Sequence, residues 1–258
     1  MVKEAAVGFA RTCIAVLCMT LLTFASAVTA EPVKPAGEDW LFAAEIYAWL
    51  PTIENTDKNG NKTKITLDDI LKNLDFTAMA VAGARKGKWS ILAEVVYMDL
   101  SKNSDEYRTQ RIRVKEIQLE SWVVSPTVGY TVYADDRHVI DVFAGARYLW
   151  VEAGTDIRLE IADESRTRNV SDSGSVWDGI VGVRGVNRYS PKWSSIYSLS
   201  GGAGDSKYTW QANVSLAYKF DTVSAAVGWQ YLTWDFENDA PLQDMTINGP
   251  YVGAIFHF

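Results

Sequence analysis

The sequence predicts a closed, antiparallel, up-and-down transmembrane β-barrel, with ten strands as the expected count. Three observations predict this fold class. Apolar and polar residues alternate along most of the chain, short turns alternate with long polar connections, and no stretch after residue 30 resembles a membrane-spanning helix. After residue 30, the longest uncharged runs are residues 121–134 and 245–258, whereas a spanning helix needs about 20 apolar residues. Such a chain can cross a bilayer only as a closed barrel, because lipid cannot satisfy unpaired backbone groups.

Composition narrows the classes of protein further. The chain has 258 residues, of which 48% are hydrophobic and 12% aromatic, so it is too apolar to be disordered. Its net charge of -7 argues against nucleic acid as the main partner.

Residues 1–30 are expected to be a cleaved signal peptide, and residues 31–258 the barrel domain. A short segment with Lys3 and Arg11 precedes an uncharged apolar stretch, and small residues follow before Glu31 and Pro32. This order is typical of a secretory signal, and the alternative is a membrane anchor that stays attached. Both cysteines lie in this segment, so the mature domain is predicted to fold without disulfides.

The alternation assigns a residue set to each face of every strand. For example, Ile140, Val142 and Ala144 alternate with residues of the opposite face that include Asp141, Gly145 and Arg147. The predicted strands are residues 40–52, 75–86, 89–100, 112–133, 138–153, 175–189, 193–203, 207–220, 223–236 and 245–258. A count of eight stays open if a weak segment such as 193–203 is not a strand.

The connections fall into two classes. Tight turns are expected at residues 86–88, 134–137, 190–192 and 221–222, and polar loops at 53–74, 101–111, 154–174 and 237–243. Only residues 205–206 are short on the side of the long loops. Short periplasmic turns and long extracellular loops are typical of outer-membrane barrels. A secreted sandwich or soluble barrel is the alternative.

Aromatic residues gather near both predicted ends of the strands, as expected for two girdles at membrane interfaces. Trp49 and Tyr251 are among those assigned to the outer girdle. The face opposite the apolar one carries polar side chains that are predicted to line a narrow, water-threaded lumen. These candidates are Glu45, Arg85, Glu94, Asp141, Arg147, Asp178, Arg184, Gln211 and Gln230. Four acids and three arginines among them could pair across the lumen, because isolated buried charges are costly.

The last strand ends in Phe256 and Phe258, with apolar residues at every second position before them. This ending resembles the C-terminal signature of outer-membrane barrels, and the resemblance implies that the barrel assembly machinery reads it. The chain as a whole resembles bacterial outer-membrane β-barrels without an assigned activity, similar to small OmpA- and OmpW-like barrels. The resembling segments are residues 47–51, 69–76, 201–204, 209–211 and 248–250. Where that family tends to have Gly-Tyr-Arg-Tyr, this chain has Gln230 in place of Arg.

Catalysis is not expected. The only histidines are His138, beside a predicted turn, and His257, one residue from the C-terminus, so both map to the periplasmic end. Asp68 and Asp69 could form a carboxylate site, but Thr66 and Asp69 also make a capping box for a short helix over residues 67–74. The sequence has no metal-ligand spacing and no phosphate-binding glycine loop, so no metal and no cofactor are expected.

The expected function is therefore that of a structural component or narrow passive conduit in the bacterial outer membrane. The alternatives are an adhesin or receptor that acts through its long loops, including residues 156–167, and a hydrolase at the outer rim. The expected partners are membrane lipid and lipopolysaccharide, whose phosphates residues 58–64 could contact if that basic stretch is more than a solvated loop.

Overall fold

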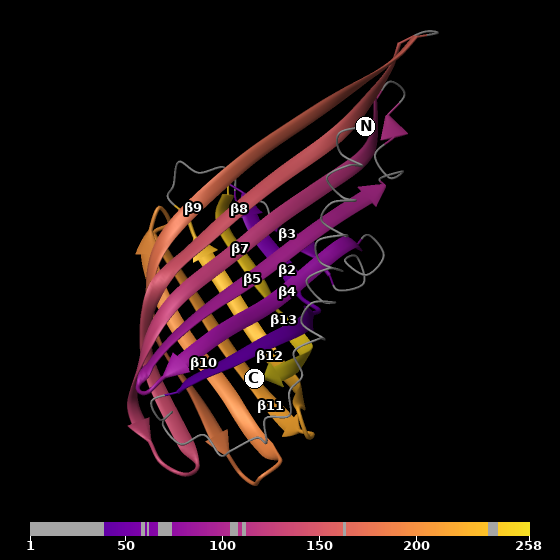
Figure 1. Ribbon diagram of the computed structural model, residues 1–258. Coiled ribbons are helices and arrows are strands. Elements are labelled where there is room, and N and C mark those ends of the chain that lie inside the picture. The colour runs from indigo at the N-terminus through magenta and orange to yellow at the C-terminus, as the bar shows by residue number, and fades with distance from the viewer. Residues whose placement is uncertain are drawn as a thin grey trace.

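The alternating segments of the chain form one antiparallel sheet that closes into a barrel (Figure 1). The structure is a computed structural model that describes residues 39–57, 60, 62–66, 74–103, 108–109, 112–161, 164–236 and 242–258. Ten strands form the barrel: β1 (Trp40–Trp49), β4 (Leu74–Lys86), β5 (Trp89–Asn103), β7 (Ile112–Ala134), β8 (His138–Ile161), β9 (Glu164–Arg188), β10 (Trp193–Gly204), β11 (Tyr208–Lys219), β12 (Val223–Asp235) and β13 (Leu242–His257).

The barrel closes where its first and last strands pair. β1 pairs with β13 from Ala43 opposite His257 to Trp49 opposite Tyr251, and with β4 on its other edge. The prediction of a closed barrel of ten strands is thereby confirmed. The eight-stranded alternative is wrong, because residues of the weak segment form β10 and pair with both β9 and β11.

Four connections at one end of the barrel are short, as predicted. They are residues 87–88, 135–137, 189–192 and 220–222, and we call this end the turn end. Gly87 has a φ of 57°, a left-handed conformation that glycine adopts without steric cost in a tight hairpin. Both described chain ends, at β1 and β13, also lie at the turn end.

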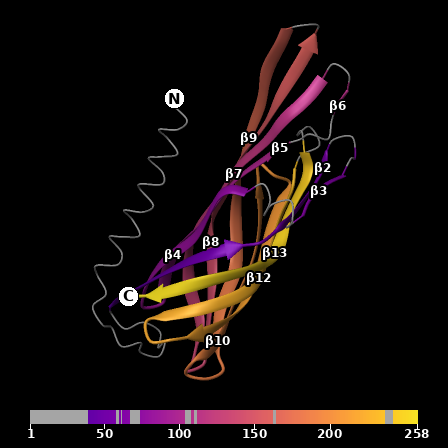
Figure 2. The same cartoon turned by 90° about the vertical axis from the view of Figure 1, so that its right-hand side faces the viewer.

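The opposite end, which we call the far end, is uneven in height. β7, β8 and β9 have 23, 24 and 25 residues, whereas the other barrel strands have 10 to 16. These three strands rise well beyond the rest in both views (Figures 1 and 2). The prediction of a polar loop over residues 154–174 is therefore wrong, because β8 and β9 stay paired to Ile161 and Glu164. The alternation of apolar and polar residues continues only to Ile161, but the strands stay paired through the polar remainder, so polarity alone does not end a strand.

Two shorter pieces complete the far end. β2 (Thr52–Asp57) pairs with the first half of β13, and β3 (Lys62–Ile65) pairs with β2. This hairpin occupies part of the segment predicted as the first loop. β6 (Arg108–Thr109) pairs with the start of β7.

The outward face of the barrel is apolar. Its exposed residues come from every side of the barrel and include Ile91, Val128, Val142, Val181, Leu199, Val214, Val227 and Val252. Paired aromatic rings flank this band, with Trp89–Tyr130 and Trp193–Tyr218 at the turn end and Tyr97–Trp122 and Tyr148–Trp177 toward the far end. A surface of this kind suits lipid with an interface at each side. The described part of the chain contains no helix long and apolar enough to cross a membrane.

Two aromatic residues do not belong to the girdle. Trp49 and Tyr251 are buried at 3% and 4% exposure and face the barrel interior. The sequence prediction was wrong for both, because the strands carry apolar residues on both faces near the far end. Alternation alone cannot tell which face points outward there.

Other predictions fall outside the described residues. These are the signal peptide over residues 1–30, residues 67–73 of the predicted helix with Asp68 and Asp69, and residues 58, 59 and 61 of the basic stretch. Leu74, the expected last residue of that helix, begins β4 instead.

Neighbouring glycines of β10 offer a matched test of the packing between strands. A Cβ atom added to Gly202 would collide with the carbonyl group of Gly179, whereas at Gly201 the nearest atom would be 3.7 Å away. We expect Gly202→Ala to lower the free energy of unfolding by about 1–3 kcal/mol, and Gly201→Ala to leave it nearly unchanged. Urea unfolding of both variants in detergent measures the difference, and equal midpoints would contradict the close approach of β9 and β10.

Candidate functional site

The barrel interior is the candidate site, because it gathers the polar residues singled out from the sequence. Along each strand, the inward residues change character from the turn end to the far end. From the turn end to the far end, they form a polar cluster around Asp141, then a network around Glu94, and then an apolar layer in the far half.

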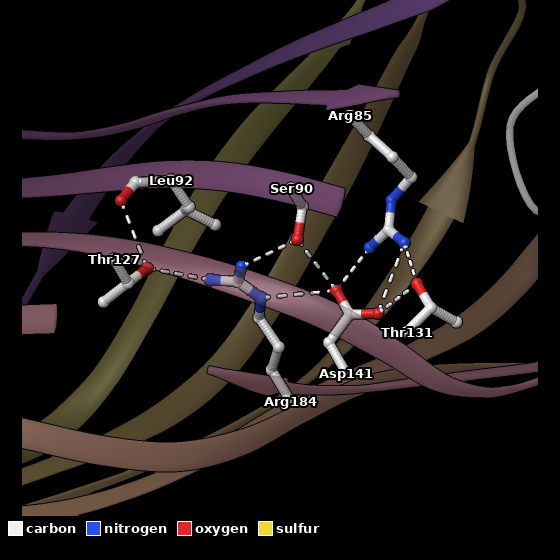
Figure 3. Close-up of polar contacts among 7 residues, drawn as sticks. All are labelled: Arg85, Ser90, Leu92, Thr127, Thr131, Asp141 and Arg184. Carbon is white, nitrogen blue, oxygen red and sulfur yellow. Dashed lines mark hydrogen bonds and ion pairs between the residues drawn. The ribbon is translucent and has the colours of Figure 1, made fainter. Parts of the chain in front are cut away.

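The Asp141 cluster lies between two arginines (Figure 3). Arg85 donates hydrogen bonds from both terminal nitrogens to the Asp141 carboxylate, and Arg184 Nε lies 3.5 Å from Asp141 Oδ2. Thr131 and Ser90 each donate a hydroxyl hydrogen bond to Asp141, at 2.8 and 3.2 Å. The carboxylate is 1% exposed, so two guanidinium groups and two hydroxyls replace its hydration.

Each arginine of the cluster has a second partner. Arg85 donates to Thr131 at 2.6 Å, and Arg184 donates to Thr127 and Ser90 at 3.0 Å each. The Arg184 guanidinium also lies over the Phe143 ring, 5.0 Å from its centroid. These contacts join β4, β5, β7, β8 and β9 from inside, so the cluster fixes half of the barrel wall.

The second interior group is centred on Glu94. Its carboxylate accepts hydrogen bonds from Tyr47 Oη at 2.7 Å, Gln211 Nε2 at 3.0 Å and Gln230 Nε2 at 3.3 Å. These partners belong to β1, β11 and β12, so the network crosses from β5 to the other side of the barrel. We call it the Glu94 network.

Arg147 and Gln230 extend the Glu94 network on either side. Arg147 donates to Gln211 Oε1 at 2.6 Å, and also to hydroxyls of Ser200 and Thr209. Gln230 accepts a hydrogen bond from Asn213 while donating to Glu94. An arginine at that position, as in the resembling family, could only donate, whereas the amide of Gln230 does both.

Two further acids predicted from the sequence lie in the barrel interior. Glu45 is on β1, and its Oε1 atom is buried without a hydrogen-bond partner among the described residues. Asp178 lies opposite Arg147 in the β8–β9 register, but it accepts hydrogen bonds from the backbone N–H and hydroxyl of Ser206 instead.

Asp178 explains the short connection at residues 205–206. This turn folds against β9, where Asp205 Oδ2 accepts from the Trp177 N–H and the Asp205 N–H donates to the Trp177 carbonyl. Ser206 is consequently 2% exposed. The hydrogen bonds from Ser206 to Asp178 thus hold this short turn against the barrel interior.

The structure places all of the predicted polar candidates on the inward face but pairs few of their charges. Within the described interior, ion pairs join Asp141 to Arg85 and Arg184, whereas Arg147, Glu94, Glu45 and Asp178 have none. In place of the expected ladder of paired charges, most of these charged groups form hydrogen bonds with neutral partners. Sequence reasoning missed the neutral partners Tyr47, Ser90, Thr127, Thr131, Ser200, Thr209 and Asn213, although alternation places them on the same face.

The far half of the interior is apolar. Buried residues from opposite sides of the barrel form one cluster there: Tyr47, Trp49, Ile53, Met79, Val96, Met98, Val123, Leu149, Leu232, Trp234, Met245, Ile247 and Tyr251. Trp234 is 0% exposed, and Leu232 and Val96 are 1% exposed. We call this cluster the apolar layer. The polar lining expected from the sequence is therefore replaced in this half by buried apolar side chains of several strands.

The remaining predicted residues lie at the turn end. Phe258 exchanges backbone hydrogen bonds with Phe42, and Phe256 lies opposite Ala44 and Val223 in the seam. His257 Nε2 lies 3.3 Å from Ser224 Oγ, and His138 Nδ1 lies 3.0 Å from Asp135 in the turn. The Tyr133 hydroxyl and the backbone N–H groups of Arg137 and His138 donate to Asp135, which holds the pKa of this exposed carboxyl well below its usual range. Among the described residues, no cluster of His, Cys, Asp and Glu could hold a metal ion.

The Asp141 cluster allows a direct test of its part in stability. Asp141→Asn preserves the shape of the side chain but leaves Arg85 and Arg184 buried side by side without a counter-charge. We expect it to lower the free energy of unfolding by about 3–5 kcal/mol. Arg85→Gln is the control and should cost less, because Asp141 keeps Arg184. Urea unfolding monitored by loss of the compact gel band measures both, and an Asp141→Asn barrel as stable as the parent would contradict this role.

Comparison with solved structures places the fold. The outer membrane protease OmpT from Escherichia coli matches with a TM-score of 0.50 and 11% identity, over 91% of this chain and 99% of OmpT. Ail, the attachment invasion locus protein of Yersinia pestis, matches at a TM-score of 0.35 and 8% identity, over 86% of this chain and 99% of Ail. Neisserial surface protein A matches at 0.34 and 11%, over 85% and 97% of the two chains. No family model and no curated protein sequence matches this chain.

At such identities the similarity concerns the fold alone, and it rests on the comparison with OmpT. The similar structures include several kinds of outer-membrane barrel, and not only the OmpA- and OmpW-like barrels that the sequence resembles. The closed sheet, the apolar outward band and the flanking aromatic pairs agree with this fold. The chain is an integral β-barrel of the bacterial outer-membrane type.

Proposed function

We propose that this protein is a closed, non-conducting barrel of the bacterial outer membrane that anchors an extracellular extension for binding. The apolar layer is the observation that carries the first half of this proposal. It replaces the narrow passive conduit expected from the sequence, and it leaves the role of structural component in place.

An ion that passed through the barrel would have to lose its water inside the apolar layer. The polar residues nearest to the layer belong to the Glu94 network, and their hydrogen-bonding groups are mostly engaged with one another. Removing an ion from water without replacement ligands costs several kcal/mol, and hydrophobic constrictions close pores by dewetting. The interior therefore supports a sealed barrel.

The extension formed by β7, β8 and β9 supports the binding half of the proposal. Pairing between β9 and β10 ends at Asp178 opposite Gly204, so residues 164–176 of β9 have one strand neighbour among the described residues. An unpaired strand edge offers a row of backbone donors and acceptors to an incoming strand. In the expected orientation, with the turn end in the periplasm, this edge stands outside the cell.

The proposal includes no catalytic step. Both histidines have partners at the turn end, away from the extension.

Conductance tests the sealed interior. In planar bilayers, the refolded protein should give no channel events above background. The double variant Leu232→Ala and Trp234→Ala should conduct, because it removes two buried side chains that cross the apolar layer. Val227→Ala with Trp229→Ala is the matched control, since these residues face lipid on the same strand. Channels of the parent protein equal in size to those of the double variant would contradict the proposal.

Shortening the extension tests binding. Asp156 and Asn169 lie opposite each other in β8 and β9, so residues 157–168 can be replaced by an Asn-Gly turn that suits a two-residue hairpin. The barrel should keep its heat-modifiable gel mobility. Cells that display the shortened protein should lose retention on cultured epithelial cells and aggregation with one another. Equal retention and aggregation for both proteins would refute binding through the extension.

A further inference from the structure

The outward face of the far end holds a groove that the proposed function does not use. It has a volume of about 470 Å³ and is lined by β11, β12, β13, β2 and β3. This side of the barrel lies opposite the extension of β7, β8 and β9 in the strand order. The groove exists because β2 and β3 continue the sheet past β13 without joining β4.

Strand register arranges the lining residues in two rows across the five strands. The row nearer the membrane band consists of Trp210, Thr233, Thr246, Glu54 and Lys64. The row above it consists of Tyr208, Asp235, Asp244, Thr56 and Lys62. Each row therefore runs from an aromatic ring through hydroxyls and carboxylates to a lysine.

One end of the groove is formed by a pair of aromatic rings. Trp210 stacks on Tyr231 with ring centroids 4.5 Å apart and an interplanar angle of 20°. Trp210 is 37% exposed, so a face of the pair is accessible to a ligand. Stacked rings present a negative face to whatever lies over them.

The rest of the groove is polar and already ordered. Glu54 and Lys64 form an ion pair at 2.7 Å, and Thr233 and Thr246 share a hydroxyl hydrogen bond at 2.7 Å. Asp235 lies 3.8 Å from Lys207, and Asp244 adds a further carboxylate to the lining. Carboxylates and hydroxyls next to an aromatic face match a ligand that has C–H groups on one side and hydroxyls around its rim.

We propose that this groove binds a pyranose sugar of the glycolipid that forms the outer leaflet around the barrel. The C–H face of the sugar would lie on the exposed face of Trp210, which Tyr231 supports from the other side, and its hydroxyls would donate to Asp235, Asp244 and Glu54. The lining holds three acids and two lysines, which favours a hydroxyl-rich group over a phosphate.

Position identifies the glycolipid as the source of the sugar. Trp210 and Tyr231 continue the ring of far-end aromatic pairs that includes Tyr148–Trp177. Such rings sit at headgroup level. The groove therefore opens above the headgroup level, where the core sugars of an outer-leaflet glycolipid stand, and it is independent of binding through the extension.

Titration calorimetry of the full refolded chain in detergent tests the proposal. The probes are lipooligosaccharide with its core sugars, lipid A without them, and the core oligosaccharide without lipid. We expect lipooligosaccharide to bind about tenfold more tightly than lipid A, and the free oligosaccharide to bind more weakly than either. Trp210→Leu should abolish the preference for core sugars. Trp177→Leu is the matched control, because Trp177 also contacts a tyrosine ring in the far-end girdle but does not line the groove.

Asp244→Asn keeps the test informative if Trp210→Leu does not fold. It should weaken lipooligosaccharide binding about fivefold and leave lipid A binding unchanged. Equal affinity for lipooligosaccharide and lipid A in the parent protein would overturn the proposal, as would equal losses in the two tryptophan variants. Free oligosaccharide that binds as tightly as lipooligosaccharide would overturn the assignment to membrane glycolipid.

Discussion

The pairing of β1 with β13 is the constraint on which the rest of the structure depends. In lipid, an unpaired strand edge leaves a row of backbone groups without partners, and each one is costly. The seam removes both edges at once, from Ala43 and His257 to Trp49 and Tyr251. Because the seam joins the first and last strands, every other strand must be in its correct register before the barrel closes. The exchange of hydrogen bonds between Phe42 and Phe258 completes the seam at the turn end.

Closure of ten strands creates an interior that side chains must fill, and this chain fills it in two ways. Near the turn end, hydrogen bonds around Asp141 and Glu94 satisfy polar groups that face away from lipid. Near the far end, the apolar layer fills the same space with mainly apolar side chains, among which Tyr47, Trp49 and Tyr251 also donate hydrogen bonds. The polar region holds opposite walls together at specific distances, whereas the apolar layer excludes water. Together they make the barrel a solid support, which is what an extension on one side requires.

Much of the fold follows from the sequence because lipid imposes strict alternation. The ends of β5, β8 and β11 were placed closely at the turn end, where one face is apolar and the other polar. The same rule failed for Trp49 and Tyr251, since both faces of β1 and β13 are apolar at the far end. It also failed at residues 154–174, where strands in water need no apolar face. The inward position of residues such as Arg85 and Asp141 follows from alternation, but their partners do not. Which groups meet depends on the register between strands, which brings Ser90, Thr131 and Arg184 to a single carboxylate.

The unequal heights of the strands have a mechanical consequence. A ribbon of three strands resists bending within its own plane, because that motion would stretch its rows of hydrogen bonds. It bends more readily perpendicular to that plane. A force on the end of β8 and β9 would thus bend the ribbon when it acts perpendicular to the plane of the ribbon. A force within that plane would instead be transmitted to the barrel. Asp178, which accepts hydrogen bonds from Ser206, joins β9 to the neighbouring turn at the base of this extension.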